Sequence, residues 1–133
     1  MNHKEVEEYV LSMPNAKLEY PFGEDVAVYK FIPTENVGRK RTNSDAPNGG
    51  RSRMFALISE KADPLRISLK CDPQLAVLLR EKYETVLEGY HLNKKHWNTV
   101  ILTGQLPWEE VQGLIRHSYD LVVGNSNAIP KMK

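Results

Sequence analysis

The chain is organised around the stretch Gly89-Tyr90-His91-Leu92-Asn93-Lys94-Lys95-His96-Trp97-Asn98-Thr99-Val100-Ile101-Leu102. It opens at a glycine, a turn residue, and then gathers two lysines, two histidines and two aromatic residues. The alternation from Trp97 to Leu102 predicts a strand, with Trp97, Thr99 and Ile101 on one face. No Asp or Glu occurs between Gly89 and Trp108, so this part of the chain is locally basic.

Length and composition set broad limits on the fold and its location. A chain of 133 residues fits one domain, 1–133, with one core. The formal net charge of +1 favours no particular partner, so an electrostatic function needs a local charge asymmetry. The single cysteine, Cys71, permits no intramolecular disulfide and fits a reducing compartment. Because the chain shows neither a signal peptide at its start nor an apolar run of about 20 residues, we expect a cytoplasmic protein.

The remaining elements follow from periodicity and from start and stop signals. Asp72-Pro73 predicts a helix start, because the aspartate can cap free amides and the proline loses no partner there. In order, the chain predicts a helix over 2–13, a strand over 26–32, a long loop, strands over 54–59 and 65–71, the helix from Asp72-Pro73, the strand over 97–102 and a helix from Pro107 to Gly124-Asn125. The short connections favour an α+β domain of two layers, an antiparallel sheet with helices packed mainly on one face.

The segment Pro33–Arg53 breaks this pattern with proline, glycine and few apolar side chains. A connection this long in a compact domain is usually functional or disordered. It is also strongly basic, with Glu35 and Asp45 the only acids against Arg39, Lys40, Arg41, Arg51 and Arg53. Two interpretations stand: a clamp on a phosphate backbone, or an insertion without a role. The tail 126–133 is short and polar, and we expect it to be mobile.

The turn before Trp97 provides the first candidate binding residues: Asn93, Lys94, Lys95 and His96. Lysines neutralise phosphates, asparagine can bond a base edge or a phosphate, and an exposed aromatic ring can stack on a base. Lys70 and Arg66 add charge from the polar face of the strand over 65–71. The alternative is a solvated turn, with Tyr90 and Trp97 in the core. The phase of Trp97 with Ile101 favours a structural role for Trp97 and leaves the lysines as the functional candidates.

Other chemistries find less support in the sequence. His91, His96 and His117 match no zinc spacing, so we predict no metal site and no cofactor. Cys71 could be a nucleophile beside Lys70, but its phase with Leu69 favours a buried hydrophobic role. Scattered acids could bind a cation or form a solvated surface: Glu5, Glu7, Glu8, Glu19, Glu24 and Asp25. The chain carries no Gly-rich phosphate loop, no Gly-x-Ser-x-Gly and no HExxH, so we predict no catalytic residue and no enzyme.

Several segments together resemble the MmcQ/YjbR family: Tyr20-Pro21-Phe22-Gly23, Ile67–Pro73, Gly89–Val100, Gly104-Gln105-Leu106-Pro107 and Leu114–Val123. We assign structural roles to the signature positions Pro21, Phe22, Gly23, Tyr90, Trp97, Gly104, Pro107 and Tyr119. The resemblance implies a small bacterial α+β domain of the CyaY-like type. The family is commonly labelled DNA-binding from its similarity to double-wing folds, which is a fold-level argument. This chain departs from the family in its long basic loop, which lies between two predicted strands where a wing could be.

These observations favour a protein that binds nucleic acid, DNA in the first instance, through contacts to the backbone. Two alternatives from other classes stay open at this point. One is a protein–protein interaction module, and the other is a metal-binding protein like the frataxins, whose acidic surfaces bind iron.

Overall fold

The computed structural model describes residues 2–33, 52–89 and 92–124, which form six strands and three helices. In chain order they are α1 (His3–Leu11), β1 (Ala16–Glu19), β2 (Val26–Phe31), β3 (Arg53–Ser59), β4 (Arg66–Lys70), α2 (Pro73–Lys82), β5 (Val86–Glu88), β6 (Trp97–Ile101) and α3 (Trp108–Val123). Most of the predicted 33–53 loop, Tyr90, His91 and the tail lie outside the described residues.

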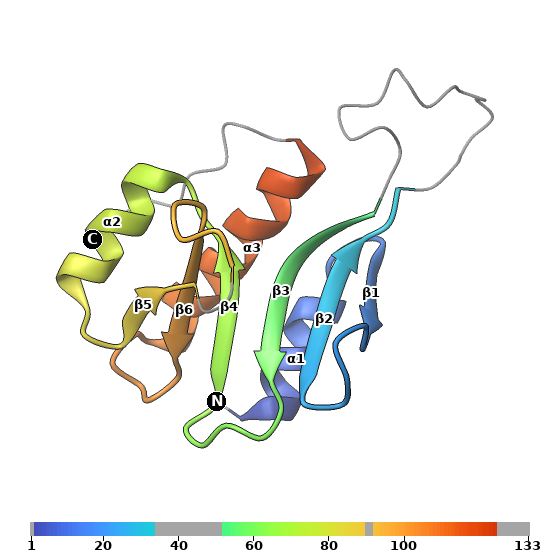
Figure 1. The fold of residues 1–133 in the computed structure, drawn as a ribbon, viewed down its shortest axis with the longest axis horizontal. Helices are drawn as coiled ribbons and strands as arrows, with labels where there is room; N and C mark the ends of the chain where they lie inside the picture. The colour runs from blue at the N-terminus through green and yellow to red at the C-terminus, as the bar shows by residue number, and fades with distance from the viewer. Residues whose placement is uncertain (1, 34–51, 90–91, 125–133) are drawn as a thin grey trace.

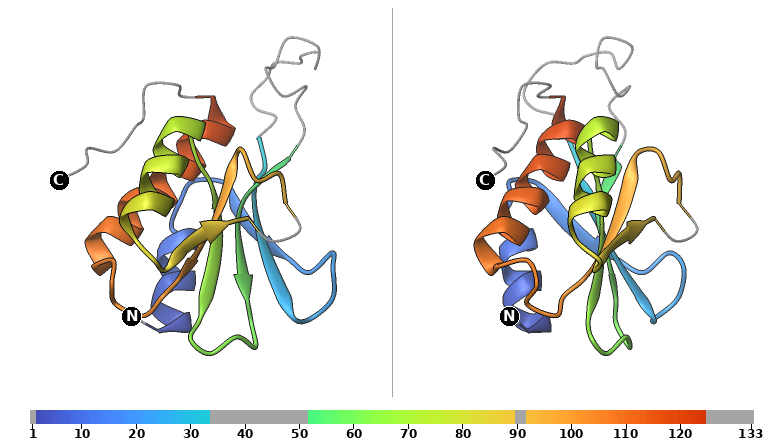
Figure 2. Two further views of the ribbon diagram at one scale, coloured as in Figure 1. Left: turned by 60° about the vertical axis from the view of Figure 1, so that its left-hand side comes forward. Right: turned by 90° about the vertical axis from the view of Figure 1, so that its left-hand side faces the viewer.

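All six strands join one sheet in the order β1-β2-β3-β4-β6-β5, and each neighbouring pair is antiparallel (Figure 1). The three helices lie together on one face of this sheet (Figure 2). We call the other face the open face. The predicted α+β architecture of two layers is confirmed.

The main core lies between the helices and the sheet. Among the largest fully buried side chains are Tyr29, Phe55, Ile58, Ile67 and Ile115. The predicted caps contribute to this packing by fixing where the helices begin. Asn2 accepts a hydrogen bond from the Glu5 amide at 2.9 Å, and Asp72 accepts from two amides at the start of α2.

A serine on α3 joins two strands of the sheet. The hydroxyl of Ser118 accepts from the amide of Lys70 on β4 at 2.9 Å and donates to the carbonyl of Phe55 on β3. Near this point the register between β2 and β3 shifts at Tyr29/Lys30, which is an irregularity of the β-bulge type. The serine therefore bonds one backbone group on each of two neighbouring strands, and its own side chain is fully buried.

A second, smaller cluster lies on the open face. Val28, Leu57 and Trp97 are buried there, and Val26, Met54 and Leu92 pack against them. Leu92 belongs to the segment between β5 and β6, which projects from the sheet on the side away from the helices (Figure 2). This segment therefore covers part of the open face.

Three predictions about the elements are wrong in detail. Residues 17–23 and 84–92 show no strand pattern in the sequence, which predicts connecting chain there, but the structure forms the edge strands β1 and β5 at these places. β3 begins at Arg53 rather than Met54, so Arg53 belongs to a strand and not to the loop. The helical spacing of Leu75, Leu78 and Leu79 in the sequence predicts a buried stripe on α2, but Leu78 is 53% exposed, and Ala76 is buried instead.

Within residues 2–33, 52–89 and 92–124, no helix combines the length and the apolar character that crossing a membrane requires.

Candidate nucleic-acid interface

The turn at residues 92–96 is held by backbone contacts from both ends. Asn93 accepts a hydrogen bond from the Lys95 amide at 2.9 Å through its side chain, and its carbonyl accepts from the His96 amide. The His96 carbonyl in turn accepts from the amide of Cys71, at 2.8 Å. Asn93 is thus a turn-forming residue, because its side-chain oxygen is already engaged within the turn.

Gly89 allows this turn to approach the sheet closely. A Cβ atom at position 89 would lie 2.7 Å from the Cβ of Trp97 and 3.1 Å from its carbonyl oxygen. The Gly89 amide donates to that carbonyl at 2.9 Å. The glycine that opens the stretch is therefore required by packing against Trp97.

Trp97 is buried, with 7% of its surface exposed, and packs against Val28 and Leu57. This burial agrees with a structural position for Trp97 and removes it as a platform for base stacking. It lies on the open face, across from Lys70 on β4. Its burial therefore comes from the small cluster on the open face and not from the main core.

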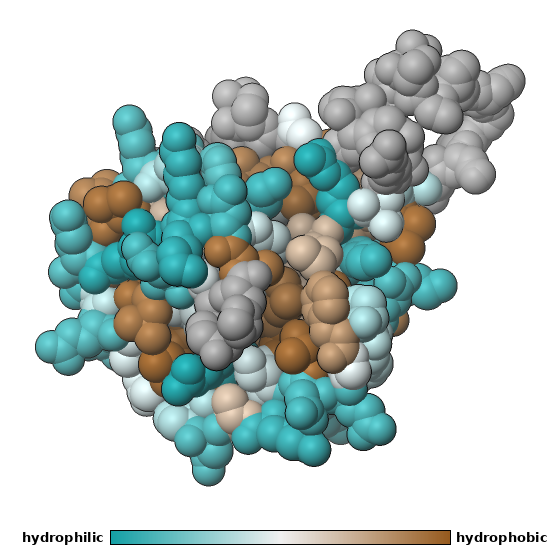
Figure 3. All heavy atoms as spheres, in the orientation of Figure 1, coloured by the Kyte–Doolittle hydropathy of each residue, from teal (hydrophilic) through white to brown (hydrophobic). Residues whose placement is uncertain are grey.

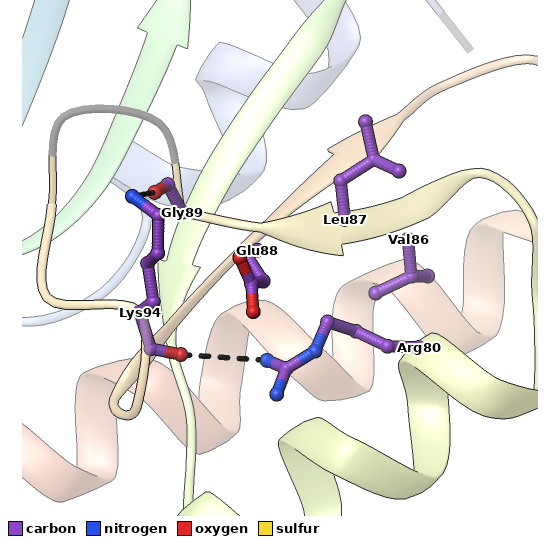
Figure 4. Close-up of a pocket in the computed structure, with 6 residues that line it drawn as sticks. All are labelled: Arg80, Val86, Leu87, Glu88, Gly89 and Lys94. Carbon is purple, nitrogen blue, oxygen red and sulfur yellow. Dashed lines mark hydrogen bonds between the residues drawn. The ribbon is translucent and has the colours of Figure 1, made fainter.

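Arg80 on α2 is a residue that the sequence reading missed. Its guanidinium donates to the side-chain oxygen of Asn98 at 2.6 Å and to the Lys94 carbonyl at 3.4 Å (Figure 4). Asn98 is buried and also donates to the Ala76 carbonyl. Arg80 therefore ties the turn to α2. Only the general preference of arginine for several acceptors could have pointed to such a role.

An open pocket of about 560 Å³ lies beside this contact. It is lined by Arg80, Val86, Leu87, Glu88, Gly89 and Lys94. In Figure 4 the Glu88 side chain points from β5 toward Arg80, and the Lys94 ammonium group lies beside Gly89. That ammonium group donates to the Gly89 carbonyl at 3.4 Å, so Lys94 takes part in the turn as well as presenting charge.

Two lysines that the sequence did not group with the turn, Lys17 and Lys30, lie on the open face. Lys17 on β1 lies directly across from Lys30 on β2, in phase with Val28 of the small cluster. Lys30 forms an ion pair with Glu19 at 3.0 Å. Lys70 extends the same face on β4, and burial, together with the charge of Arg53, lowers its pKa. By strand register these lysines share the open face with the apolar cluster. Figure 3 shows brown, apolar side chains in the middle of the face that it views, with teal, hydrophilic ones around them.

The predicted binding residues do not all lie close together in the structure. Lys70, at the end of β4, lies next to the start of β6 and the turn that precedes it, and the charge of Arg53 acts on it. Arg66 lies at the other end of β4, roughly 13 Å away along the strand, across from Ser59 and Ile101. It therefore does not join the others. Arg39, Lys40, Arg41 and Arg51 lie outside the described residues.

The signature positions divide into two kinds. Gly23 and Gly104 adopt φ values of +102° and +98°, which favour glycine, and Pro107 is the residue immediately before α3. Tyr119 packs edge-on against Phe55, with ring centroids 5.3 Å apart, and its hydroxyl donates to Pro14.

Two signature residues, Pro21 and Phe22, lie outside the core. Pro21 is exposed and Phe22 is 64% exposed, on the turn between β1 and β2. The Gly23 conformation accounts for the shape of this turn, but the core does not account for its aromatic residue.

His117 and Cys71 have structural positions. His117 is buried and accepts a hydrogen bond from the Asp72 amide at 3.1 Å, which links α3 to the start of α2. Burial raises the pKa of the Cys71 thiol to about 12, so the reactive thiolate is disfavoured at neutral pH. The structure thus agrees with the buried, unreactive reading of Cys71.

Three of the acids grouped from the sequence have partners of their own. Glu19 pairs with Lys30, Asp25 pairs with Lys61 at 3.1 Å, and Glu7 accepts from the buried Tyr29 hydroxyl at 2.7 Å. Glu7 also lies near His3 and Glu60, a grouping that the sequence did not predict.

The chain shares sequence with bacterial proteins of one family. The YjbR family model matches residues 11–121. The Escherichia coli K12 protein YjbR, named as uncharacterised, is 40% identical over 80 residues, which are 60% of this chain and 65% of that protein. The chain thus spans just under two-thirds of that relative. The Escherichia coli O157:H7 protein YbdF, also named as uncharacterised, is 31% identical over 91% of this chain and 84% of its own.

Solved structures agree with this relationship. Protein DR2400 of Deinococcus radiodurans, described as carrying a DUF419 domain, superposes with a TM-score of 0.76 at 34% identity, over 92% of this chain and 79% of that one. A Pseudomonas syringae protein gives 0.64 at 28% identity, over 91% and 98%. Sequence, motifs and fold lead to one conclusion: this chain belongs to the YjbR family.

Proposed function

We propose that this protein binds nucleic acid, DNA in the first instance, through contacts to the sugar–phosphate backbone from the open face of its sheet. The observation that carries the proposal is the placement of Lys17, Lys30 and Lys70 on this face beside the turn of Lys94 and Lys95. The role is one of binding, without catalysis.

The charge on this face supports backbone contacts. Strand register places Lys17, Lys30 and Lys70 on the open face. Glu19 on β1 is an acidic residue on the same face, and it is already paired with Lys30. A surface with excess lysine attracts phosphates and releases their counterions. Lys70 is the lysine of this face for which a phosphate would matter most. Its partial burial and the nearby charge of Arg53 disfavour its positive charge, and a bound phosphate would offset that cost.

The proposal assigns no base stacking to Trp97. Base stacking requires an exposed ring, and Trp97 is covered by the turn and the small cluster. Asn93 uses its side-chain oxygen within the turn. The proposal therefore predicts binding that depends on phosphate charge and shows little preference for sequence.

The decisive variant is Lys70→Gln with Lys95→Gln, measured by fluorescence anisotropy on a labelled DNA duplex, on single-stranded DNA and on RNA of the same sequence. We expect the affinity for the preferred nucleic acid to fall about tenfold for each lysine at low salt, and the slope of log K against log salt to shrink by about 2. Lys94 is left in place because its amine bonds the turn.

The matched control is Lys4→Gln with Lys61→Gln, which removes the same charge from α1 and from the β3–β4 turn. The control should keep the wild-type slope. Equal losses in both variants would show that only net charge matters, and the open face would no longer be the interface. A flat salt response in the wild type would overturn nucleic-acid binding altogether and favour a protein partner.

A further inference from the structure

Three side chains from separate parts of the chain converge behind the sheet. His3 and Glu7 lie one helical turn apart on α1, so they share a face, and Glu60 follows the end of β3. Each offers one ligand atom, and these atoms all lie within 4.8 Å of one another. The ring nitrogen Nε2 of His3 is 2.8 Å from the Oε1 of Glu60.

The histidine nitrogen at this point is shielded from solvent and faces a carboxylate. Nε2 of His3 lies 2.8 Å from the Oε1 of Glu60, the distance of an ion pair when the imidazole carries a proton. A metal ion bound by this nitrogen and by the two carboxylates would take the place of that proton.

Two tyrosines hold the carboxylates from behind. The hydroxyl of the fully buried Tyr29 donates to the Oε2 of Glu7 at 2.7 Å. The hydroxyl of Tyr20 donates to the Oε2 of Glu60 at 3.4 Å, which leaves Oε1 facing His3. Hydrogen bonds of this kind orient metal ligands and fix which oxygen is presented.

The charge of the cluster also favours a cation. Two carboxylates face one imidazole, and among residues 2–33, 52–89 and 92–124 no lysine or arginine lies within salt-bridge distance of Glu7 or Glu60. One nitrogen and two carboxylate oxygens suit a first-row divalent cation better than Mg²⁺ or Ca²⁺, which prefer oxygen alone.

We propose that His3, Glu7 and Glu60 form a binding site for a first-row divalent cation, with Tyr20 and Tyr29 as positioning residues. Ligand bonds of about 2.0–2.2 Å would require the three side chains to close up slightly around the ion. Three protein ligands leave a coordination position open to water or to a further ligand. The site shares no residue with the lysines of the open face, so the two proposals can fail independently.

The test is isothermal titration of the full chain, free of any polyhistidine tag, with Zn²⁺ and with Mn²⁺, and with Mg²⁺ as the hard-cation comparison. We expect one Zn²⁺ per chain and no measurable Mg²⁺ binding. His3→Gln and Glu60→Gln should each weaken Zn²⁺ binding at least tenfold, and Tyr29→Phe should weaken it roughly tenfold to a hundredfold through the loss of orientation.

The controls are Glu8→Gln on the exposed side of α1 and His96→Gln in the distant turn. Both should bind Zn²⁺ as the wild type does. Because His3 is the first residue of α1 and is partly exposed, His3→Gln should keep the wild-type circular dichroism spectrum and show that the loss is not unfolding. Wild-type Zn²⁺ affinity in His3→Gln and Glu60→Gln, or an equal loss in Glu8→Gln, would overturn the site.

Discussion

The two faces of the sheet are built by different means. The helix face buries large side chains such as Phe55, Ile58 and Ile67 under α1, α2 and α3. On the open face, the buried apolar side chains among the described residues form the small cluster of Val28, Leu57 and Trp97. The turn at residues 92–96 that packs there is held by Gly89, Arg80 and backbone hydrogen bonds. The difference indicates that stability resides on the first face, whereas the second can carry charge for binding.

The strongest test of this comparison uses two neighbours on β3 that face opposite ways. Ile58→Ala should lower the free energy of unfolding by about 4 kcal/mol, and Leu57→Ala by about 2 kcal/mol, because Ile58 lies in the main core and Leu57 under a thinner cover. Urea unfolding measures both. Equal costs would show that the two faces stabilise the protein alike.

A second test displaces the cover of the open face without touching the helices. Gly89→Ala places a methyl group against Trp97, and we expect a cost of about 1–3 kcal/mol from overpacking. In a Trp108→Phe background, the emission of Trp97 should shift to the red as the turn lifts.

Gly113→Ala on α3 is the matched control, because an added Cβ meets nothing within 4 Å there. It should stabilise the protein by about 0.5–1 kcal/mol, since alanine favours a helix over glycine. A loss of stability as large as that of Gly89→Ala would show that the effect is not specific to the open face.

The smallest expected effect is a change of stability with pH that comes from Lys70 on the open face. Burial and Arg53 lower the pKa of Lys70 in the folded protein, so the unfolded chain binds that proton more tightly. The wild type should therefore gain stability as the pH rises from the folded pKa toward the ordinary value of 10.5.

Lys70→Met removes this gain. At neutral pH the variant should be slightly more stable than the wild type, by less than about 0.5 kcal/mol, while it binds DNA more weakly. Urea midpoints at neutral and alkaline pH measure the gap between the two proteins. A gap that does not narrow as the pH rises would contradict the assignment.

Much of the architecture was predictable, because local signals matched the global fold. The caps at Asn2 and Asp72, the alternation in β4 and β6, and the glycine after α3 all predicted elements that exist. The two edge strands were missed because they are short, with four and three residues, and such segments carry too few side chains to show a period of two.

The candidate sites were less predictable for a physical reason. Alternation shows which residues share a face, but it does not show which face the helices cover, so Trp97 could be placed in phase but not on the open face. Lys17 and Lys30 become neighbours only through strand pairing. Glu7 and Glu60 belong to different layers, and the sequence between them holds no pattern that brings them together.

The hydroxyl of Ser118 has a consequence for how the domain opens. It occupies the gap between the Lys70 amide and the Phe55 carbonyl, so a side chain of α3 completes the junction of β3 and β4. Separation of the helix from the sheet would leave both backbone groups without the hydroxyl. Separation of the two strands would leave the hydroxyl without one of its hydrogen-bond partners. The amide proton of Lys70 should therefore exchange with solvent only in the concerted opening of helix and sheet, as one cooperative unit.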